Sequence, residues 1–354
     1  MLERPALDDS TIVAALRDRY GLPVASLTFL PLGNDSAAWT YRATASDNSE
    51  WFVKVRRDPR PAGILVPRFL RDHGLNEIVA ARLTRDGEPW LEIGPWSLLV
   101  YPLVDAPSAM SAGLDQGGWR RLGAFAARLH ATTLPPDLTA IVPREDFRPK
   151  ATEMARRVGR HVDAGPGSER TRDEIADRVL GVWTEHRAVI ERLLRRTEEL
   201  ARRIRDREGL ARPIRFVPCH ADLHVANVLV GADGGLSIVD WDEIVLAPPE
   251  RDLMFVRGSA IAGVVSDRDA TAFEAGYGAR EAAAADPLLI AWYRIDWAVQ
   301  DLADFARRAL LDSEAGPATR ANALALFESN FAPGGEVETA IAADEGLPAW
   351  SEPA

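Results

Sequence analysis

Cysteine and histidine are scarce in this chain of 354 residues, and long apolar runs are absent. The single cysteine, Cys219, excludes an internal disulfide and suits a reducing compartment. No apolar run approaches the roughly 20 residues that span a bilayer, and the first residues have neither the basic nor the apolar segment of a secretory leader. We therefore expect a cytoplasmic protein without a membrane partner.

The composition that remains is that of a globular protein large enough for two lobes. Hydrophobic residues make up 47% of the chain and charged residues 27%, which allows a sizeable core. The net charge of -11 is uneven, because residues 240–354 carry -13 and the preceding part carries +2. An acidic C-terminal part disfavours nucleic acid and favours a small cationic ligand, although solvated helix faces account for most of these charges.

One segment carries a distinctive set of chemical groups. It reads His220-Ala-Asp222-Leu-His224-Val-Ala-Asn227, followed by an apolar stretch, a Gly-rich turn and a second apolar stretch that ends at Asp240. The two short stretches are β-branched, as in a strand hairpin that would bring Asn227 and Asp240 to one end. Phosphoryl transfer uses this combination: a carboxylate beside the accepting hydroxyl and two oxygen ligands for Mg²⁺.

The same residue types also have a plainer interpretation and a rival one. His, Asp and Asn commonly satisfy buried backbone groups in turns, so no single residue of the segment is decisive. The His-x-Asp-x-x-x-x-Asn spacing, with a second carboxylate after a hairpin, favours a kinase. The rival is a metallohydrolase with His220, Asp222 and His224 as ligands. That chemistry usually needs further histidines nearby, and the other four are scattered along the chain.

Lysine occurs only twice among 42 basic residues, and Lys54 lies inside the apolar stretch Phe-Val-Lys-Val-Arg. A half-buried lysine needs an anion, and its compact ammonium suits both a carboxylate and nucleotide phosphates. We predict a phosphate clamp between Lys54 and Glu77, the latter on a helix expected over residues 75–85. A lysine at a sheet edge that reaches water is the simpler alternative. Two interpretations stay open for the preceding turn over residues 33–36. Either it contacts phosphate through Ser36 or its backbone, or it is a plain hairpin turn.

The remaining pattern predicts an α+β fold with two lobes. A helix is expected over 7–20, then strands over 24–32, 37–44 and 51–56, the helix over 75–85, and strands near 90–93 and 96–103. Residues 100–105 change from strand to irregular chain, where backbone groups could hydrogen-bond an adenine edge. We place a small sheet lobe at residues 1–103 and a larger, mainly helical lobe at 104–354.

The predicted helical lobe begins with a helix over 119–131 and continues with one long helix over about 172–207. Arginines alternate with glutamates along the long helix, which is typical of a solvated surface rich in ion pairs. After the hairpin we expect helices to about residue 331 and a loosely ordered end beyond it.

The hairpin segment, the Lys54 strand and Leu129-His130 together resemble the aminoglycoside phosphotransferase family, the small-molecule branch of the protein-kinase-like fold, over nearly the whole chain. The segments 220–224, 239–243 and 249–255 are most similar to those of the spectinomycin phosphotransferases. The resemblance implies a bilobal kinase with an antiparallel-sheet N-lobe and a helical C-lobe. Val225-Ala226 departs from the Gly or Pro usual before the Asn, and Asp-Trp-Asp at 240–242 replaces Asp-Phe-Gly, which argues against a protein kinase.

The resemblance also implies individual roles. Asp222 would be the catalytic base, Asn227 and Asp240 the Mg²⁺ ligands, and Lys54 with Glu77 the clamp on the phosphates of ATP. Adenine would lie against the backbone of Tyr101 and Leu103. His220 and Asp252 would support the catalytic loop.

We therefore expect transfer of the γ-phosphoryl group from ATP to a hydroxyl of a small cationic aminocyclitol, best represented by spectinomycin, a reaction of antibiotic resistance. Four carboxylates are candidates for holding ammonium groups of this acceptor: Asp242, Glu243, Asp296 and Asp301. For the last two, a plain core helix is the alternative. Kinases of a sugar, choline-like or amino-alcohol metabolite stay as rivals, as does a nucleotide-binding pseudokinase, although the intact site residues speak against it.

Overall fold

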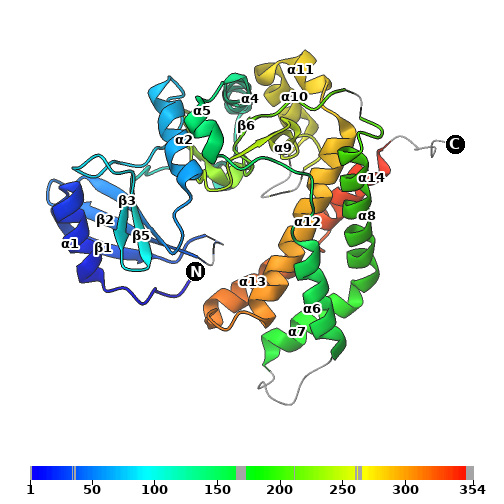
Figure 1. Cartoon of the computed structure of the whole chain (residues 1–354), viewed down its shortest axis with the longest axis horizontal. Helices are drawn as coiled ribbons and strands as arrows, with labels where there is room; N and C mark the ends of the chain where they lie inside the picture. Colours follow the sequence, from blue (N-terminus) through cyan, green and yellow to red (C-terminus); the bar gives the residue numbers. More distant parts are fainter. Residues whose placement is uncertain are drawn as a thin grey trace. The chain divides into compact units, whose positions relative to one another are not determined.

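The computed structural model describes residues 2–33, 35, 37–164, 173–210, 212–259, 261 and 265–347 (Figure 1). They group into two compact units, to each of which the chain contributes three segments. The first unit comprises Met1–Leu114, Ala131–Pro143 and Val225–Ile244, and the second comprises Asp115–His130, Arg144–His224 and Val245–Ala354. The main sheet lies in the first unit and the long helices in the second, which agrees with the predicted α+β class. The lobe boundary at residues 103–104 stays a prediction.

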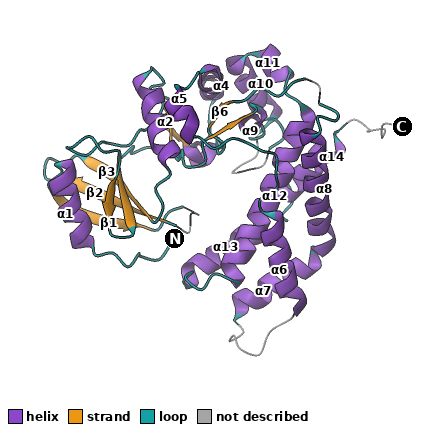
Figure 2. Ribbon diagram, viewed as in Figure 1, coloured by secondary structure: helices purple, strands orange, loops and turns teal. Residues whose placement is uncertain are grey.

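A five-stranded antiparallel sheet organises the first unit (Figure 2). Its strands follow the order β1-β2-β3-β5-β4, and all five were predicted to within a few residues: β1 (Val24–Leu30), β2 (Ala38–Ala45), β3 (Glu50–Arg56), β4 (Leu91–Ile93) and β5 (Trp96–Pro102). Lys54 pairs with Thr40 of β2 and with Leu99 of β5. It therefore lies on a central strand, which rules out the sheet-edge alternative.

The two faces of this sheet differ in polarity. On one face, Val53 and Val55 join an apolar core with the buried side of helix α1 (Asp9–Tyr20). Side chains alternate along a strand, so Lys54 and Arg56 point to the opposite face. The alternation explains how β3 is apolar and yet presents two cations to one side.

The prediction of a helix over residues 75–85 is wrong. The helix lies earlier, as α2 (Pro61–Asp72), which starts with proline at its first position and is followed by Gly74 at φ 98°. Beyond it the chain runs alongside a strand, because Ile238 N donates to Glu77 O at 2.7 Å and Val79 N donates to Ile238 O at 3.2 Å. Backbone groups of this segment thus have a strand partner in place of helical ones.

The predicted hairpin is confirmed as β7 (Val228–Val230) and β8 (Leu236–Ile238), an antiparallel pair in the first unit. A 3-10 turn, η1 (Val225–Asn227), leads into β7 and packs against α3 (Ala109–Ala112). Helix α5 (Pro136–Ile141) packs against α2. The hairpin is therefore built into the same unit as the large sheet.

Helices dominate the second unit around the long helix α12 (Pro287–Leu310), which is buried along most of its length. It packs against six others: α6 (Thr152–Ala164), α7 (Glu174–Glu185), α8 (Arg187–Arg205), α9 (Glu250–Leu253), α13 (Pro317–Ser329) and α14 (Glu336–Glu345). The unit also holds α4 (Gln116–Ala131), α10 (Asp267–Tyr277), α11 (Ala279–Ala283) and the antiparallel pair β6 (Val217–Cys219) and β9 (Val245–Ala247). A helix apolar on most sides is typical of such a central position.

Two predictions for this unit are wrong. The long helix over 172–207 is two helices, α7 and α8, separated at His186, whose ring stacks on Phe331 with centroids 4.0 Å apart. Residue 172 itself lies outside the described residues. Between residues 336 and 345 the chain is not loosely ordered as predicted, because α14 buries Val337 and Ala340 against the unit; residues 348–354 lie outside the described residues.

Helices α4 and α10 cross where both carry glycine. A Cβ atom on Gly276 of α10 would lie 1.9 Å from Arg120 O of α4, and one on Gly123 of α4 would lie 2.0 Å from Phe273 O. Any side chain at either position would overlap backbone atoms. The two glycines thus allow a helix contact that no larger residue permits.

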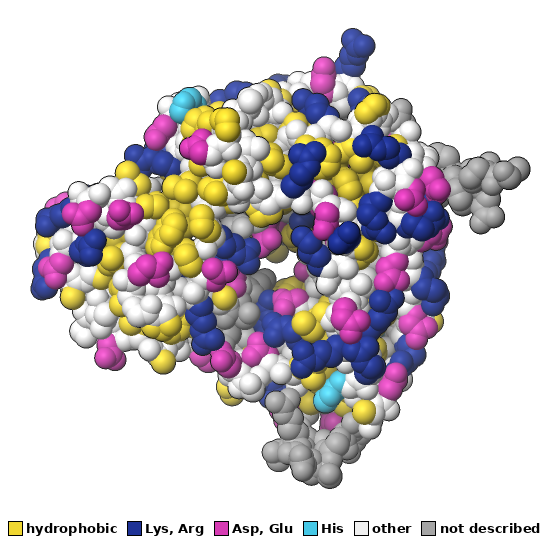
Figure 3. All heavy atoms as spheres, viewed as in Figure 1, with side chains coloured by type: hydrophobic (Ala, Val, Ile, Leu, Met, Phe, Trp, Pro, Cys, Tyr) yellow, Lys and Arg dark blue, Asp and Glu magenta, His cyan; other side chains and the backbone are white. Residues whose placement is uncertain are grey.

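The predicted ion-paired surface is confirmed on α8. Arg156 binds Glu198 at 2.7 Å, and Arg196 binds Glu199 at 2.8 Å and Asp344 at 2.6 Å. Figure 3 shows basic and acidic side chains interleaved on this part of the surface. Among the described residues, no helix is both long and apolar enough to cross a membrane.

Candidate active site

The first unit encloses a cavity of about 420 Å³ beside the polar face of the sheet. Apolar side chains from the sheet and the hairpin line one part of it, including Leu30, Phe52 and Leu229. Polar groups line another part: Asp35, Lys54, Asn227, Asp240 and Asp242. A pocket with an apolar part and one group of charges suits a ligand that is flat at one end and charged at the other.

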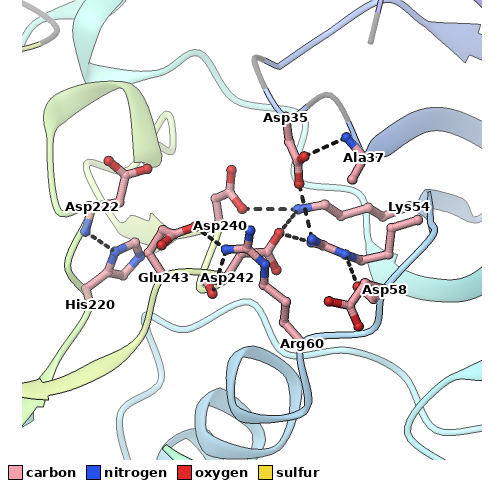
Figure 4. A network of polar contacts seen from close by, with 11 residues as sticks. Asp35, Ala37, Lys54, Asp58, Arg60, His220, Asp222, Asp240, Asp242 and Glu243 are labelled. Atoms are coloured by element: carbon pink, nitrogen blue, oxygen red, sulfur yellow. Dashed lines mark hydrogen bonds and ion pairs between the residues drawn. The ribbon is translucent and has the colours of Figure 1, made fainter. Parts of the chain in front are cut away.

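Lys54 is held in this cavity by two carboxylates. Its side chain is 12% exposed, and Nζ lies 3.1 Å from Asp240 Oδ1 and 2.5 Å from Asp242 Oδ2 (Figure 4). Burial disfavours the ammonium, but the charges of Asp240 and Asp242 outweigh it and raise the Lys54 pKa. Burial likewise opposes ionisation of Asp242, but Lys54 and Arg56 lower its pKa. Lys54 and Asp242 are therefore both charged at neutral pH.

The ion pairs of Lys54 do not test the predicted clamp with Glu77. We expected Glu77 on a helix, whereas the ion pairs found for Lys54 join it to Asp240 and Asp242. Glu77 lies in the extended segment that pairs with β8. Its part in a clamp stays a prediction.

The hairpin brings Asn227 and Asp240 to one end, as the sequence predicts. Val239 N donates to Asn227 O at 3.1 Å, so the residue before Asp240 is bonded to Asn227. Asp240 follows at φ 61°, a left-handed conformation that non-glycine residues seldom adopt. Both side chains line the cavity, and the Asp240 side chain is 48% exposed. One amide oxygen and one accessible carboxylate are donors that a hard divalent cation accepts.

Hydrogen bonds of β5 and the residue after it show in which direction the backbone groups predicted to contact adenine point. Leu103 N donates to Glu50 O of β3 at 3.2 Å, whereas Val100 O accepts from Arg82 N on the other side of the strand. Because backbone groups alternate along a strand, Tyr101 and Leu103 direct their N–H and C=O towards β3. Pro102 O, which we had not singled out, then points to the opposite side, and Val104 lies beyond the end of β5. All four residues line the cavity.

In the second unit, Asp252 holds the backbone of the segment around Asp222. Its carboxylate accepts from His220 N at 3.0 Å, from Ala221 N at 2.7 Å and from His130 Nε2 at 3.0 Å. Burial favours the neutral acid, but these partners prevail and lower the pKa of Asp252. Ala221 sits at φ 68°, a conformation that the two bonds from this carboxylate help to hold.

Asp222 itself has histidine on either side. Its backbone N donates to His220 Nδ1 at 3.2 Å (Figure 4). Its Oδ1 lies 3.0 Å from His224 Nε2. His220 thus holds the backbone of Asp222, and His224 lies beside its carboxylate. Within the described residues, the cluster with metal-ligand spacing is His130, Cys219 and Asp252, all buried, and not the set that the metallohydrolase alternative requires.

A group of carboxylates lies on and beside α12. Burial, followed by the charge and hydrogen bond of Glu336, raises the Asp301 pKa well above its usual value, with smaller contributions from Asp304 and Asp222. Burial raises the Glu336 pKa as well, although the bond from Asp301 opposes this rise. Asp301 and Glu336 therefore hold a proton more readily than exposed carboxyl groups do. A cation placed between them would favour loss of that proton.

Aromatic rings adjoin this acidic group. Trp297, one turn before Asp301 on α12, makes an edge contact with Phe255 at 5.1 Å between centroids and with His224 at 6.5 Å. Since His224 also contacts Asp222, the rings connect the Asp222 segment to the acidic group within the second unit. Asp301 was a candidate in the sequence analysis, whereas Glu336 and Trp297 were not.

The four predicted acceptor carboxylates are divided between the two units. Asp242 binds Lys54, and Glu243 binds Arg60, both in the first unit. Asp296 is buried in the second unit, where it accepts from Thr197 Oγ1 at 3.2 Å and Gln300 Nε2 at 2.7 Å. Asp301 belongs to the acidic group just described. The predicted phosphate contact of Ser36 lies outside the described residues.

Comparison with known proteins agrees with this geometry. A family model described as the phosphotransferase enzyme family matches residues 28–288. The chain belongs to this family. Protein StrN of Streptomyces griseus is 28% identical over 292 residues, covering 80% of this chain and 79% of that protein.

Solved phosphotransferase structures share the whole architecture. The spectinomycin phosphotransferase APH(9)-Ia, in complex with ADP and spectinomycin, superposes with a TM-score of 0.83 at 25% identity, over 96% of this chain and 100% of that one. The amicoumacin kinase hAmiN, in complex with AMP-PNP and Ca²⁺, shares the fold at 15% identity and a TM-score of 0.59, over 93% and 95% of the two chains. The phosphotransferase described here is therefore a small-molecule kinase with the predicted protein-kinase-like fold.

Proposed function

We propose that this phosphotransferase transfers the γ-phosphoryl group of ATP to a hydroxyl of spectinomycin or a closely related aminocyclitol. The observation that carries the proposal is the likeness to APH(9)-Ia along 96% of the chain, a protein solved with ADP and spectinomycin. The acidic and aromatic group on α12, which suits a cationic acceptor, supports it independently.

The nucleotide would occupy the cavity of the first unit. Its apolar part suits a purine, with Pro102 O and Val104 N as hydrogen-bonding groups at the edge. Lys54, at the charged part, would leave its carboxylate partners to bind the α- and β-phosphates. The apolar and charged lining supports this orientation over the reverse one.

A divalent cation fits the donors that the hairpin provides. Asn227 and Asp240 would hold Mg²⁺, since both are oxygen donors that line the same cavity. When bound, the ion would neutralise charge on the phosphates. Asp242 then has a different role from the one we predicted, because it binds the cations Lys54 and Arg56 in place of an acceptor ammonium.

On the acceptor side, Asp222 would orient the hydroxyl and accept its proton. The hydroxyl oxygen forms a bond to the γ-phosphorus, the bond from that phosphorus to the β,γ-bridging oxygen breaks, and ADP leaves. His224, 3.0 Å from Asp222 Oδ1, would keep the carboxylate in orientation. Asp301 and Glu336 would bind an ammonium group of the acceptor.

The test is an ADP-release assay with ATP, Mg²⁺ and a panel of spectinomycin, other aminoglycosides, choline and simple sugars. The proposal expects release that depends on spectinomycin and a phosphorylated product by mass spectrometry. Asp222→Asn serves as the catalytic control. ADP release with choline or a sugar alone would show that the acceptor is one of these metabolites and not spectinomycin. Nucleotide binding without any phosphorylated acceptor would show that the protein binds nucleotide but does not catalyse the transfer.

A further inference from the structure

Arg56 is a buried cation without a role in the reaction as proposed. It lies two residues beyond Lys54 on β3, on the same face of the sheet, and its side chain is 2% exposed. Its Nη1 donates to the Asp242 carboxylate, its Nη2 to Asp35 Oδ2 at 3.2 Å and its Nε to Asp58 O at 2.6 Å. A guanidinium so deeply buried is stable because acceptors surround it. We call Arg56, Asp35 and Asp242 the Arg56 cluster.

The two carboxylates of the Arg56 cluster belong to different segments of the cavity wall. Asp35 lies between β1 and β2, where its Oδ1 also accepts from Ala37 N at 2.7 Å. Asp242 lies two residues after Asp240 and also binds Lys54. Both carboxylates line the cavity. Arg56 therefore fastens the connection after β1 to the segment that carries the proposed metal ligand.

Nucleotide binding would change the surroundings of Asp242. If Lys54 turns to the phosphates, Asp242 loses the cation that lies 2.5 Å away. Its side chain is only 14% exposed, so the carboxylate would be costly to leave without a cation. Arg56 has no need to move, because its guanidinium is held by Asp58 O and Asp35 at the same time.

We infer that Arg56 is a positioning residue for nucleotide binding: it retains Asp242, and with it the Asp240 segment, when Lys54 binds phosphate, and it anchors Asp35 at the cavity wall. The inference rests on the proposed function, because it assigns the cavity to a nucleotide. A lysine could not replace Arg56 fully, since a single ammonium cannot reach two carboxylates and a carbonyl with the fixed geometry of a guanidinium.

The experiment measures ADP affinity by calorimetry in the presence of Mg²⁺ and steady-state kinetics with ATP. The variants are Arg56→Met, Arg56→Lys, Asp35→Asn and the double variant Asp35→Asn/Arg56→Met. Arg42→Met is the matched control, because Arg42 is also an ion-paired arginine of this sheet, bound to Glu50 at 2.5 Å.

Arg56→Met is expected to raise the Kd for ADP and the KM for ATP by about tenfold, which corresponds to about 1.4 kcal/mol, and to lower kcat by less. The Kd and KM of Arg56→Lys should lie between those of Arg56→Met and those of the wild type. Asp35→Asn should raise the Kd for ADP by a smaller factor. The double variant should have a Kd no higher than that of Arg56→Met alone, because both changes remove the same ion pair. Arg42→Met should bind ADP as the wild type does.

Three results would overturn the inference. They are unchanged ADP affinity in Arg56→Met, a loss no larger than that of Arg42→Met, and additive effects of the Asp35 and Arg56 changes. Nucleotide binding by the wild type in these cases would leave the proposed function standing, whereas a wild type that binds no nucleotide would refute both. If Arg56→Met does not fold, the Kd for ADP of Asp35→Asn is compared with that of Arg42→Met. Asp35→Asn is expected to fold, because Asp35 is 33% exposed and asparagine can still accept from Ala37 N.

Discussion

Asp296 on α12 offers a quantitative test of what burial does to a carboxylate in this protein. Burial raises its pKa from 3.8 to about 6, against smaller opposing effects that include the hydrogen bond from Gln300. Asparagine has the same shape, and its amide can accept from Gln300 and donate to Thr197 Oγ1. Asp296→Asn therefore removes the ionisation while it keeps the two bonds.

The expected gain in stability follows from the difference between the folded and unfolded pKa. The folded pKa is the higher one, so the contribution of Asp296 to stability is fully present below about pH 4 and is lost as pH rises through about 6. A difference of about two units, at 1.36 kcal/mol per unit, amounts to about 3 kcal/mol. Asp296→Asn should thus match the wild type near pH 4 and exceed it by up to about 3 kcal/mol at pH 7.5.

Urea unfolding of both proteins at several pH values measures this difference. Asp267→Asn is the control, since the Asp267 side chain in the same unit is 91% exposed. A variant less stable than the wild type at pH 7.5, or a difference that does not change with pH, would refute the argument. The KM for the acceptor should stay unchanged, because Asp296 binds Thr197 and Gln300; a large rise would restore its predicted role as an acceptor carboxylate.

Three further outcomes are expected. Asp222→Ala should lower kcat by about a thousandfold or more while calorimetry still detects ADP binding, and near-wild-type turnover would remove the assignment of the base. Lys54→Met should raise the KM for ATP at least about tenfold in the same assay, and unchanged ATP dependence would exclude phosphate binding by Lys54. Gly276→Ala should destabilise the protein by about 3 kcal/mol or more in urea unfolding, because its Cβ would overlap Arg120 O. Gly181→Ala is the control: open space surrounds this position, and the change should stabilise α7 by about 0.5–1 kcal/mol. Similar effects at both positions would refute the packing argument.

The parts of the molecule that could be predicted from the sequence depend on short-range patterns. The hairpin at β7 and β8 is bounded by its own turn, and the sheet strands alternate with clear turn residues, so local reasoning found them. Asn227 and Asp240 were found for the same reason, because a hairpin fixes which residues share an end. The family resemblance rested on these same segments.

The predictions that failed needed contacts distant in sequence. The segment at Glu77 is apolar enough for a helix, but its backbone pairs with Ile238, more than 150 residues later. Helix α14 depends on packing against α12, and the Arg56 cluster joins residues 35, 56 and 242. Arg56 did leave one signal in the sequence: it is a second cation two residues from Lys54, and so on the same face of the strand.

The way in which the chain alternates between its two units limits how the protein can be divided. The path passes from one unit to the other at residues 114–115, 130–131, 143–144, 224–225 and 244–245. One of these passages separates Asp222 from Asn227, inside the motif that identified the enzyme. A fragment that ends at Leu114 would lack the hairpin whose Ile238 bonds Glu77 and Val79, leaving those backbone groups without their partner. Neither unit can be expressed as one continuous piece of sequence, so truncation would not yield a minimal nucleotide-binding domain, and only the intact chain offers every group that the proposed reaction needs.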